Sequence, residues 1–242
     1  CPLTLYSSAD SYGYRPSAVW SSGSSYIFNA SNSKDALTWD RDGSTATTFF
    51  TLTGNLRIGA LAVNGTTKRL YASVRDVGAQ VNRLLVFDIY PVTSGASPTL
   101  VATLDVNDGV TADNRILDLA VVPSLNKVFA LLPGTGGVAV LTDNGVATPT
   151  LTDVSFVGVT EIGSSYSDVV GNGRKLVYNA NSNLLYGISK DSNQMFSLDP
   201  STMELKVYAS SITGGFDALM TFNNDNLTLG VSKTLGQVFI VK

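Results

Sequence analysis

The chain has 242 residues, a mass of 25.5 kDa and a net charge of −3, with 14% charged and 44% apolar residues. It has no histidine and one cysteine, which excludes a Ser-His-Asp triad, a Cys-His pair, an imidazole metal site and an intramolecular disulfide. The weak negative charge argues against nucleic-acid binding, and the lack of any run of about 18 apolar residues argues against a transmembrane helix.

The chain begins with Cys1, and a strand-like run follows at residues 3–6. Cys1 resembles the first residue of bacterial lipoproteins, which are cleaved directly before a cysteine that then carries lipid. That resemblance implies a lipid anchor, and the alternative is a free thiol at an ordinary chain start. Abundant Ser, Thr, Asn and Gly residues, with few Lys and Glu, predict an extracellular or cell-surface location.

A unit of four short strands recurs along the chain, and short runs of this kind between Asn, Asp, Gly and Ser turns predict antiparallel hairpins. In chain order the expected strands are 18–20, 25–28, 37–39 and 47–52; 60–63, 69–72, 85–87 and 99–104; 119–122, 127–130, 139–141 and 150–156; 176–178, 184–187, 195–198 and 205–209; and 218–222, 227–230 and 238–241.

An aspartate stands at the end of the third strand in four of the units: Asp40, Asp88, Asp143 and Asp199. Lys242 has the same place in the fifth unit, and these five positions are 48, 55, 56 and 43 residues apart. Blades of a β-propeller have four strands and about 40–50 residues each, so the spacing predicts five blades.

The fold predicted is therefore all-β, a five-bladed β-propeller with four-stranded antiparallel blades. The fifth unit lacks a fourth strand and residues 3–6 lack the other three, so the N-terminal strand is expected to close the last blade and remove a free edge. Residues 1–242 form one domain, with blades at about 15–53, 57–105, 115–157, 174–211, and 216–242 plus 3–7. The alternative is a β-sandwich with accidental periodicity.

The fourth unit carries a resemblance to known repeats. Its Asn-rich turn, the Leu185-Tyr186 pair and the run from Phe196 to Thr202 resemble the YVTN-like repeats of surface-layer and lactonase-type propellers. Size and blade count are similar to the five-bladed lectins of the tachylectin type. The resemblance implies architecture, and it implies that the loops entering each first strand and joining the second strand to the third form the functional face.

Arginines precede the first strand in four of the five units: Arg15, Arg57, Arg115 and Arg174. A ring of guanidinium groups at a channel mouth suits a carboxylate, sulfate or phosphate. The alternative is that each arginine pairs with a nearby aspartate and joins neighbouring blades.

Aromatic and acidic residues of the same loops complete the candidate ligand-binding set: Tyr12, Tyr14, Tyr166, Phe216 and Asp217. Exposed aromatic rings stack on sugars and anchor protein interfaces, or else they cover the seams between blades. The turn after Asp40 has alternating acids but lacks the remaining ligands of a calcium loop, so a polar hairpin turn is expected there.

No cofactor, metal or catalytic residue is predicted. The sequence favours a non-catalytic recognition or adhesion module for a glycan, an anionic ligand or a protein. The first alternative is a structural subunit that assembles with copies of itself into a coat or filament, because low charge opposes self-association weakly. The second is a carboxylate-based glycoside hydrolase or a lactonase-like enzyme, for which Glu161, Asp168, Asp113 and Asp217 supply carboxylates.

Overall fold

The structure is a computed structural model of the chain, and it describes residues 16–31, 35–54, 56–106, 116, 118–132, 137–146, 148–156, 173–189, 195–208, 218–222, 227–232 and 237–241. These residues form nineteen β-strands and two short 3-10 helices. Within this part of the chain, no helix is long and apolar enough to cross a membrane.

The strands form five antiparallel sheets in chain order, and each sheet is one blade. Blade 1 contains β1 (Ser17–Ser21), β2 (Ser25–Ala30), β3 (Ala36–Arg41) and β4 (Thr47–Thr51); blade 2 contains β5 (Leu56–Asn64), β6 (Arg69–Asp76), β7 (Val81–Asp88) and β8 (Thr99–Val106); blade 3 contains β9 (Leu119–Val122), β10 (Lys127–Leu132), β11 (Gly137–Thr142) and β12 (Thr150–Phe156); blade 4 contains β13 (Gly173–Asn179), β14 (Leu184–Ser189), β15 (Met195–Leu198) and β16 (Leu205–Tyr208); blade 5 contains β17 (Ala218–Phe222), β18 (Leu227–Ser232) and β19 (Gln237–Val241).

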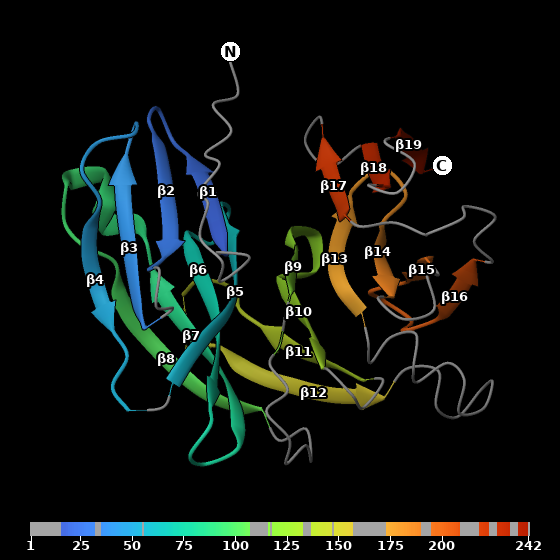
Figure 1. Cartoon of the computed structure of the whole chain (residues 1–242), viewed down its shortest axis with the longest axis horizontal. Helices are drawn as coiled ribbons and strands as arrows, with labels where there is room; N and C mark the ends of the chain where they lie inside the picture. The colour runs from blue at the N-terminus through green and yellow to red at the C-terminus, as the bar shows by residue number, and fades with distance from the viewer. Residues whose placement is uncertain are drawn as a thin grey trace.

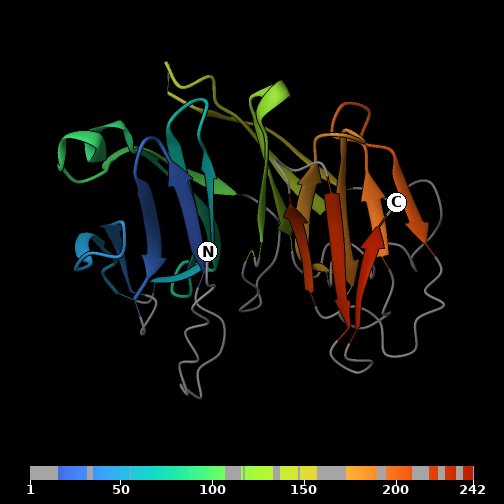
Figure 2. The same cartoon turned by 90° about the horizontal axis from the view of Figure 1, so that it is seen from above.

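The blades are arranged in a ring, and the chain is a five-bladed β-propeller (Figure 1). The first strand of each blade lies nearest the centre, and β1, β5, β9, β13 and β17 contact one another in that order along the chain. Figure 2 shows blade 1 in blue and blade 5 in red on opposite sides of the view, with blades 2, 3 and 4 following one another between them along the chain. The predicted fold class is thus confirmed, while the expected closing strand at residues 3–6 lies outside the described residues.

Apolar clusters fill the seams between successive blades. One cluster joins blades 1 and 2 and includes Phe28, Trp39 and Phe87. Similar clusters join blade 2 to blade 3, blade 3 to blade 4 and blade 4 to blade 5. Because side chains alternate between the two faces of a strand, blades 2, 3 and 4 each pack one face on the preceding blade and the other face on the following blade.

The innermost strands approach one another so closely that small residues are required. A Cβ atom added at Gly59 in β5 would collide with the backbone carbonyl oxygen of Ile116, which leads into blade 3. The hydroxyl of Ser73 donates a hydrogen bond to the same carbonyl at 3.0 Å. Close packing of blade 2 on the entry to blade 3 therefore requires a glycine at position 59.

Candidate functional site

Most of the predicted site residues fall outside the described residues: Cys1, Tyr12, Tyr14, Arg15, Arg115, Tyr166, Phe216 and Asp217. Arg174 belongs to β13, and its side chain is likewise not among the described ones. The structure therefore places one member of the predicted arginine ring, Arg57. The ring itself stays a prediction.

Arg57 is the second residue of β5, on the end of blade 2 where the chain enters its first strand. Its side chain is half-buried, and Nη1 donates a hydrogen bond to the carbonyl oxygen of Leu56 at 2.8 Å. This bond holds the guanidinium close to its own strand.

A second arginine stands directly opposite Arg57. The strands β5 and β6 pair Arg57 with Arg75, and β7 continues the same row with Asn82. Arg75 is only 1% exposed. Residues that pair directly across a sheet share a face, and Ser73, two residues before Arg75, bonds to the entry of blade 3. The two arginines are therefore on the face of blade 2 that is turned toward blade 3.

A β-bulge creates this pairing. The register of β5 with β6 shifts between Ile58 and Ala60, at the glycine that packs on Ile116. If the pairing had continued one residue for one, Arg57 would be opposite Asp76, with its opposite charge. The bulge instead sets two cations against each other, which costs free energy unless other charges compensate.

The nearby carboxylates are occupied by a third arginine. Arg83 on β7 bonds to Asp76 Oδ2 through Nη1 at 2.8 Å and to Asp105 Oδ1 through Nε at 2.7 Å. Asp105, followed by Asp76, raises the pKa of Arg83, while the Ala79 amide and then Arg83 hold the pKa of Asp76 below its usual value. Both aspartates thus serve Arg83, and this end of blade 2 keeps an excess of positive charge among its described residues.

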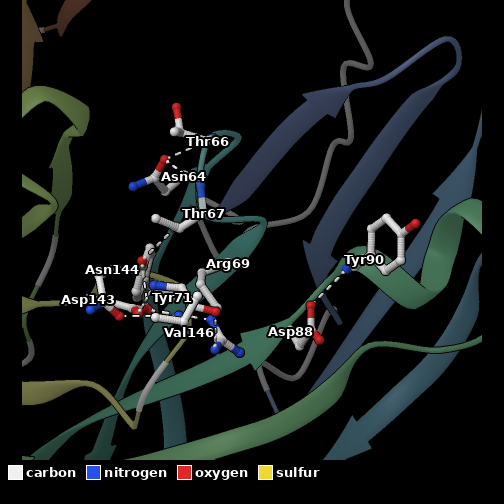
Figure 3. A network of polar contacts seen from close by, with 11 residues as sticks. Asn64, Thr66, Thr67, Arg69, Tyr71, Asp88, Tyr90, Asp143, Asn144 and Val146 are labelled. Carbon is white, nitrogen blue, oxygen red and sulfur yellow. Dashed lines mark hydrogen bonds and ion pairs between the residues drawn. The ribbon is translucent and has the colours of Figure 1, made fainter.

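A different buried ion pair lies at the opposite end of the same seam, and sequence reasoning did not single it out (Figure 3). Tyr71 donates a hydrogen bond to Asp143 Oδ2 at 3.0 Å, and Arg69 Nε lies 3.7 Å from the same oxygen. Arg69 Nη2 also donates to the carbonyl oxygen of Gly145 at 3.0 Å. These contacts join β6 of blade 2 to the turn after β11 of blade 3. Arg69 therefore joins two neighbouring blades, which is the role expected for the ring arginines if they bind no ligand.

A buried aspartate joins the next two blades. Asp118 Oδ2 accepts a hydrogen bond from the Leu176 amide at 2.8 Å, and Oδ1 accepts one from Leu119. The first contact crosses from the entry of blade 3 to the innermost strand of blade 4. Between blades 4 and 5, the side-chain Nδ2 of Asn179 donates a hydrogen bond to Thr228 Oγ1 at 2.9 Å. Buried polar side chains therefore join blade 3 to blade 4 and blade 4 to blade 5.

The acidic turn of blade 1 forms a hairpin, as predicted. Asp42 Oδ1 accepts a hydrogen bond from the Ser25 amide at 2.7 Å, and Asp40 Oδ1 accepts one from Gly43 at 3.2 Å. The Ser25 amide is the main reason that the pKa of Asp42 is lowered. Both carboxylates are thus used to hold the turn, and the described residues contain no group of three or more metal-ligating side chains.

Arg75 is the residue of this site that sequence reasoning missed. The sequence could have indicated it, because a hairpin that turns at residues 65–68 places residues 75 and 76 across from Arg57. The bulge that selects Arg75 depends on contact with Ile116 in another blade, which local sequence does not reveal.

Comparison with solved structures supports the fold. A protein from Lactobacillus plantarum is 15% identical with a TM-score of 0.62, and the match covers 94% of this chain and 70% of that one. A functionally unknown protein from Desulfotomaculum acetoxidans is 8% identical with a TM-score of 0.64, covering 96% and 70%. A chain in the nidogen/laminin complex is 11% identical with a TM-score of 0.53, covering 90% and 70%.

Sequence comparisons add no family. No protein-family model matches the chain, and no curated protein matches it. The resemblance to surface-layer repeats therefore rests on the residues of blade 4 alone. At these low identities, the structural matches establish that the chain is a β-propeller and leave its function to be argued from its own residues.

Proposed function

We propose that the chain is a non-catalytic binding module of the cell exterior or surface. Its ligand is an anionic group, a carboxylate, sulfate or phosphate, carried by a glycan or a protein. The observation that carries this proposal is the pairing of Arg57 with Arg75, beside two aspartates that both bond to Arg83.

The two arginines have different parts in the proposal. Arg57 is half-buried and contacts the ligand, since a guanidinium offers two parallel donors that match the oxygens of an anion. Arg75 is buried and does not reach the ligand, but its charge acts through a medium that screens weakly. An anion bound at Arg57 is attracted by both cations, and a ligand that binds the folded state stabilises it.

Other features support a recognition role and an external location. A chain of similar fold belongs to the nidogen/laminin complex, which is an assembly of proteins. The scarcity of Lys and Glu, with many small polar residues, suits a surface that operates outside the cell.

Binding of anionic probes to variants of the chain tests the proposal. The probes are a sulfated glycan, a sialylated glycan and a phosphopeptide, each compared with its neutral form. Loss of a hydrogen bond to a charged group costs about 1.5–3 kcal/mol, so Arg57→Ala should weaken binding about 10–100-fold. Arg57→Lys should recover part of the affinity, and added salt should weaken binding by the wild type.

The matched control is Arg41→Ala, which also removes one positive charge, at the last residue of β3 in blade 1. Arg41 is exposed and bonds to Ser24 and lies 3.6 Å from Asp42. The control should bind like the wild type. Equal binding by the Arg57→Ala and Arg41→Ala variants, or no preference for the charged form of any probe, would contradict the proposal.

The alternative is a structural subunit that assembles with itself. It is favoured by the exposed apolar residues Val238 and Ile240 on β19. Light scattering over a range of concentrations, with negative-stain imaging, separates the two functions. A particle of about 25 kDa at every concentration favours the binding module, and rings, sheets or filaments favour the subunit.

A further inference from the structure

Blade 2 has the longest regular outer edge among the described blades. In blades 1 to 4 the last strand pairs with the third strand and forms the rim of the sheet. β4, β12 and β16 have five, seven and four residues, while β8 has eight. Bulges break the register of β4 and β12, and the bulge in β8 still leaves five consecutive pairs with β7, at residues 102–106.

This edge has little of the protection that exposed edge strands usually have. Short length, proline or a charged side chain normally prevents such a strand from pairing with another chain. β8 contains no proline and one charged residue, Asp105. Asp105 Oδ1 accepts a hydrogen bond from Arg83 Nε at 2.7 Å, so its charge is paired within the same blade. Thr103 and Asp105 are both exposed, so the side chains of this edge are accessible to another molecule.

Residues 102–106 complement the same run read in the opposite direction. Antiparallel strands of two copies, centred on Leu104, place Leu104 opposite itself and Ala102 opposite Val106. They also place Thr103 opposite Asp105 at two positions, one on each side of the axis. The apolar pairs pack together, and the threonine hydroxyl donates a hydrogen bond to the carboxylate. A pairing centred one residue earlier would set each Asp105 opposite a valine, so the register centred on Leu104 is preferred.

We propose that this edge is an interface at which two copies of the chain form a dimer. The two β8 strands join blade 2 of each copy into one eight-stranded antiparallel sheet. A two-fold interface is isologous, so it closes after two copies and does not extend into a filament. Because five residue pairs make a small interface, the dimer is weak and depends on concentration.

A second copy fits this edge better than a free peptide does. β7 already holds β8 as a strand, so neither copy loses conformational entropy in forming one. A flexible peptide would have to be ordered as it binds, which lowers its affinity. The pairing of Thr103 with Asp105 is also specific to a copy that has the same two residues.

Antiparallel pairing places the Arg57 ends of the two copies on opposite sides of the dimer. An axis that reverses β8 reverses every strand of blade 2, including β5, on which Arg57 lies. A dimer therefore presents its two Arg57 ends in opposite directions and can join two anionic surfaces. This consequence rests on the proposed function, whereas the interface itself does not.

The molar mass in solution tests the interface in the full chain. Light scattering should give 25.5 kDa at low concentration and approach twice that mass as the concentration rises. Thr103→Asp sets like charges opposite each other at two positions, so it should raise the Kd of the dimer about 5–30-fold. Thr103→Lys sets a lysine opposite Asp105 and should preserve or strengthen the dimer. The matched control is Thr48→Asp, at an exposed residue of β4, which should leave the Kd unchanged.

A mass of 25.5 kDa at every concentration overturns the proposal. Equal weakening by Thr103→Asp and Thr103→Lys overturns it as well, because the proposed register sets Asp105 opposite position 103. The Thr103→Asp variant should bind each soluble anionic probe as the wild type does. Failure of the dimer is therefore distinct from failure of the proposed function.

Disulfide formation gives a second test, of the register itself. With Cys1→Ser in both chains, a mixture of Thr103→Cys and Asp105→Cys chains should form a mixed disulfide, because directly opposite Cα atoms are about 4.5–5.5 Å apart. Either variant alone should form far less, since its two cysteines are diagonal neighbours about 7–8 Å apart. Equal disulfide formation in the mixture and in either variant alone overturns the proposed pairing.

Discussion

An aspartate recurs where the third strand of a blade ends, and its carboxylate holds the turn that follows. Asp88, Asp143 and Asp199 each accept a hydrogen bond from the amide two residues further on, at 3.0, 2.8 and 2.7 Å. An Asp side chain that bonds to its own backbone in this way stabilises a tight turn. The repeated aspartate is therefore a device for turning the chain into the fourth strand.

Asp143 has a further role that makes it the most consequential of these residues. It is buried, and it accepts a second hydrogen bond from the buried phenol of Tyr71 in the neighbouring blade. Tyr71→Phe removes a donor from a buried carboxylate, so we expect a loss of about 1.5–3 kcal/mol in the free energy of unfolding. Denaturant titration measures it, and Tyr26→Phe, which also changes a buried ring, is the control and should cost less.

The same variant should change the response to alkaline pH. Burial, followed by the charge of Asp143, raises the pKa of Tyr71 above its usual value of about 10. The unfolded state then releases this proton first as the pH rises, so the stabilising contribution is complete below about pH 10 and declines above it. The stability difference between the wild type and Tyr71→Phe should narrow from pH 9 to pH 11. A constant difference across this range would contradict the assignment.

At the level of the strand, sequence predicts the position of an element better than its full length. The strand expected at 69–72 extends to Asp76, because Ser73 and Arg75 continue the ladder as buried polar residues. Apolar alternation marks where a strand begins, but it does not mark a polar stretch whose partners come from another blade. The bulge at Gly59 is of the same kind, since it depends on the carbonyl of Ile116.

A cross-strand pair repeats in blades 4 and 5. Gly187 pairs with Phe196, and Gly230 pairs with Phe239. A Cβ atom at Gly187 would collide with the ring of Phe196, which lies over the glycine. The glycine therefore makes room for an aromatic ring that reaches into the core shared by blades 3 and 4.

We expect Gly187→Ala to destabilise the protein by about 1–3 kcal/mol, because the added methyl group overpacks this site. Adding Phe196→Leu should restore part of the loss, since the smaller side chain vacates the space. Gly78→Ala, which meets an ordinary contact of 3.5 Å with Asp76, should have little effect. Chemical denaturation of these three variants and of Phe196→Leu alone measures the coupling between the two positions. Equal losses from Gly187→Ala with and without Phe196→Leu would show that the clash is not the cause.

At the level of the whole molecule, the repeat spacing predicts the blade number because each blade must form the same supersecondary unit. Four blades have their four strands among the described residues, and the fifth has three. The arginine ring was less predictable. Its positions depend on entry loops that differ in length and composition. The structure places Arg57 alone of the ring's side chains, and Arg57 lies opposite Arg75 because of the β-bulge in β5, which is not part of the repeat.

Hydrogen exchange should locate the strand that completes blade 5. In the described residues, β19 pairs on one side with β18. If residues 3–6 pair with its other side, removing residues 1–6 exposes the amides along one edge of β19 and leaves the other blades paired. Exchange at Gln237–Val241 should then become faster, while exchange at β7, the third strand of blade 2, stays the same. Unchanged exchange at β19 would mean that another part of the chain closes the ring, because an exposed edge strand is a site of aggregation that folded proteins cover.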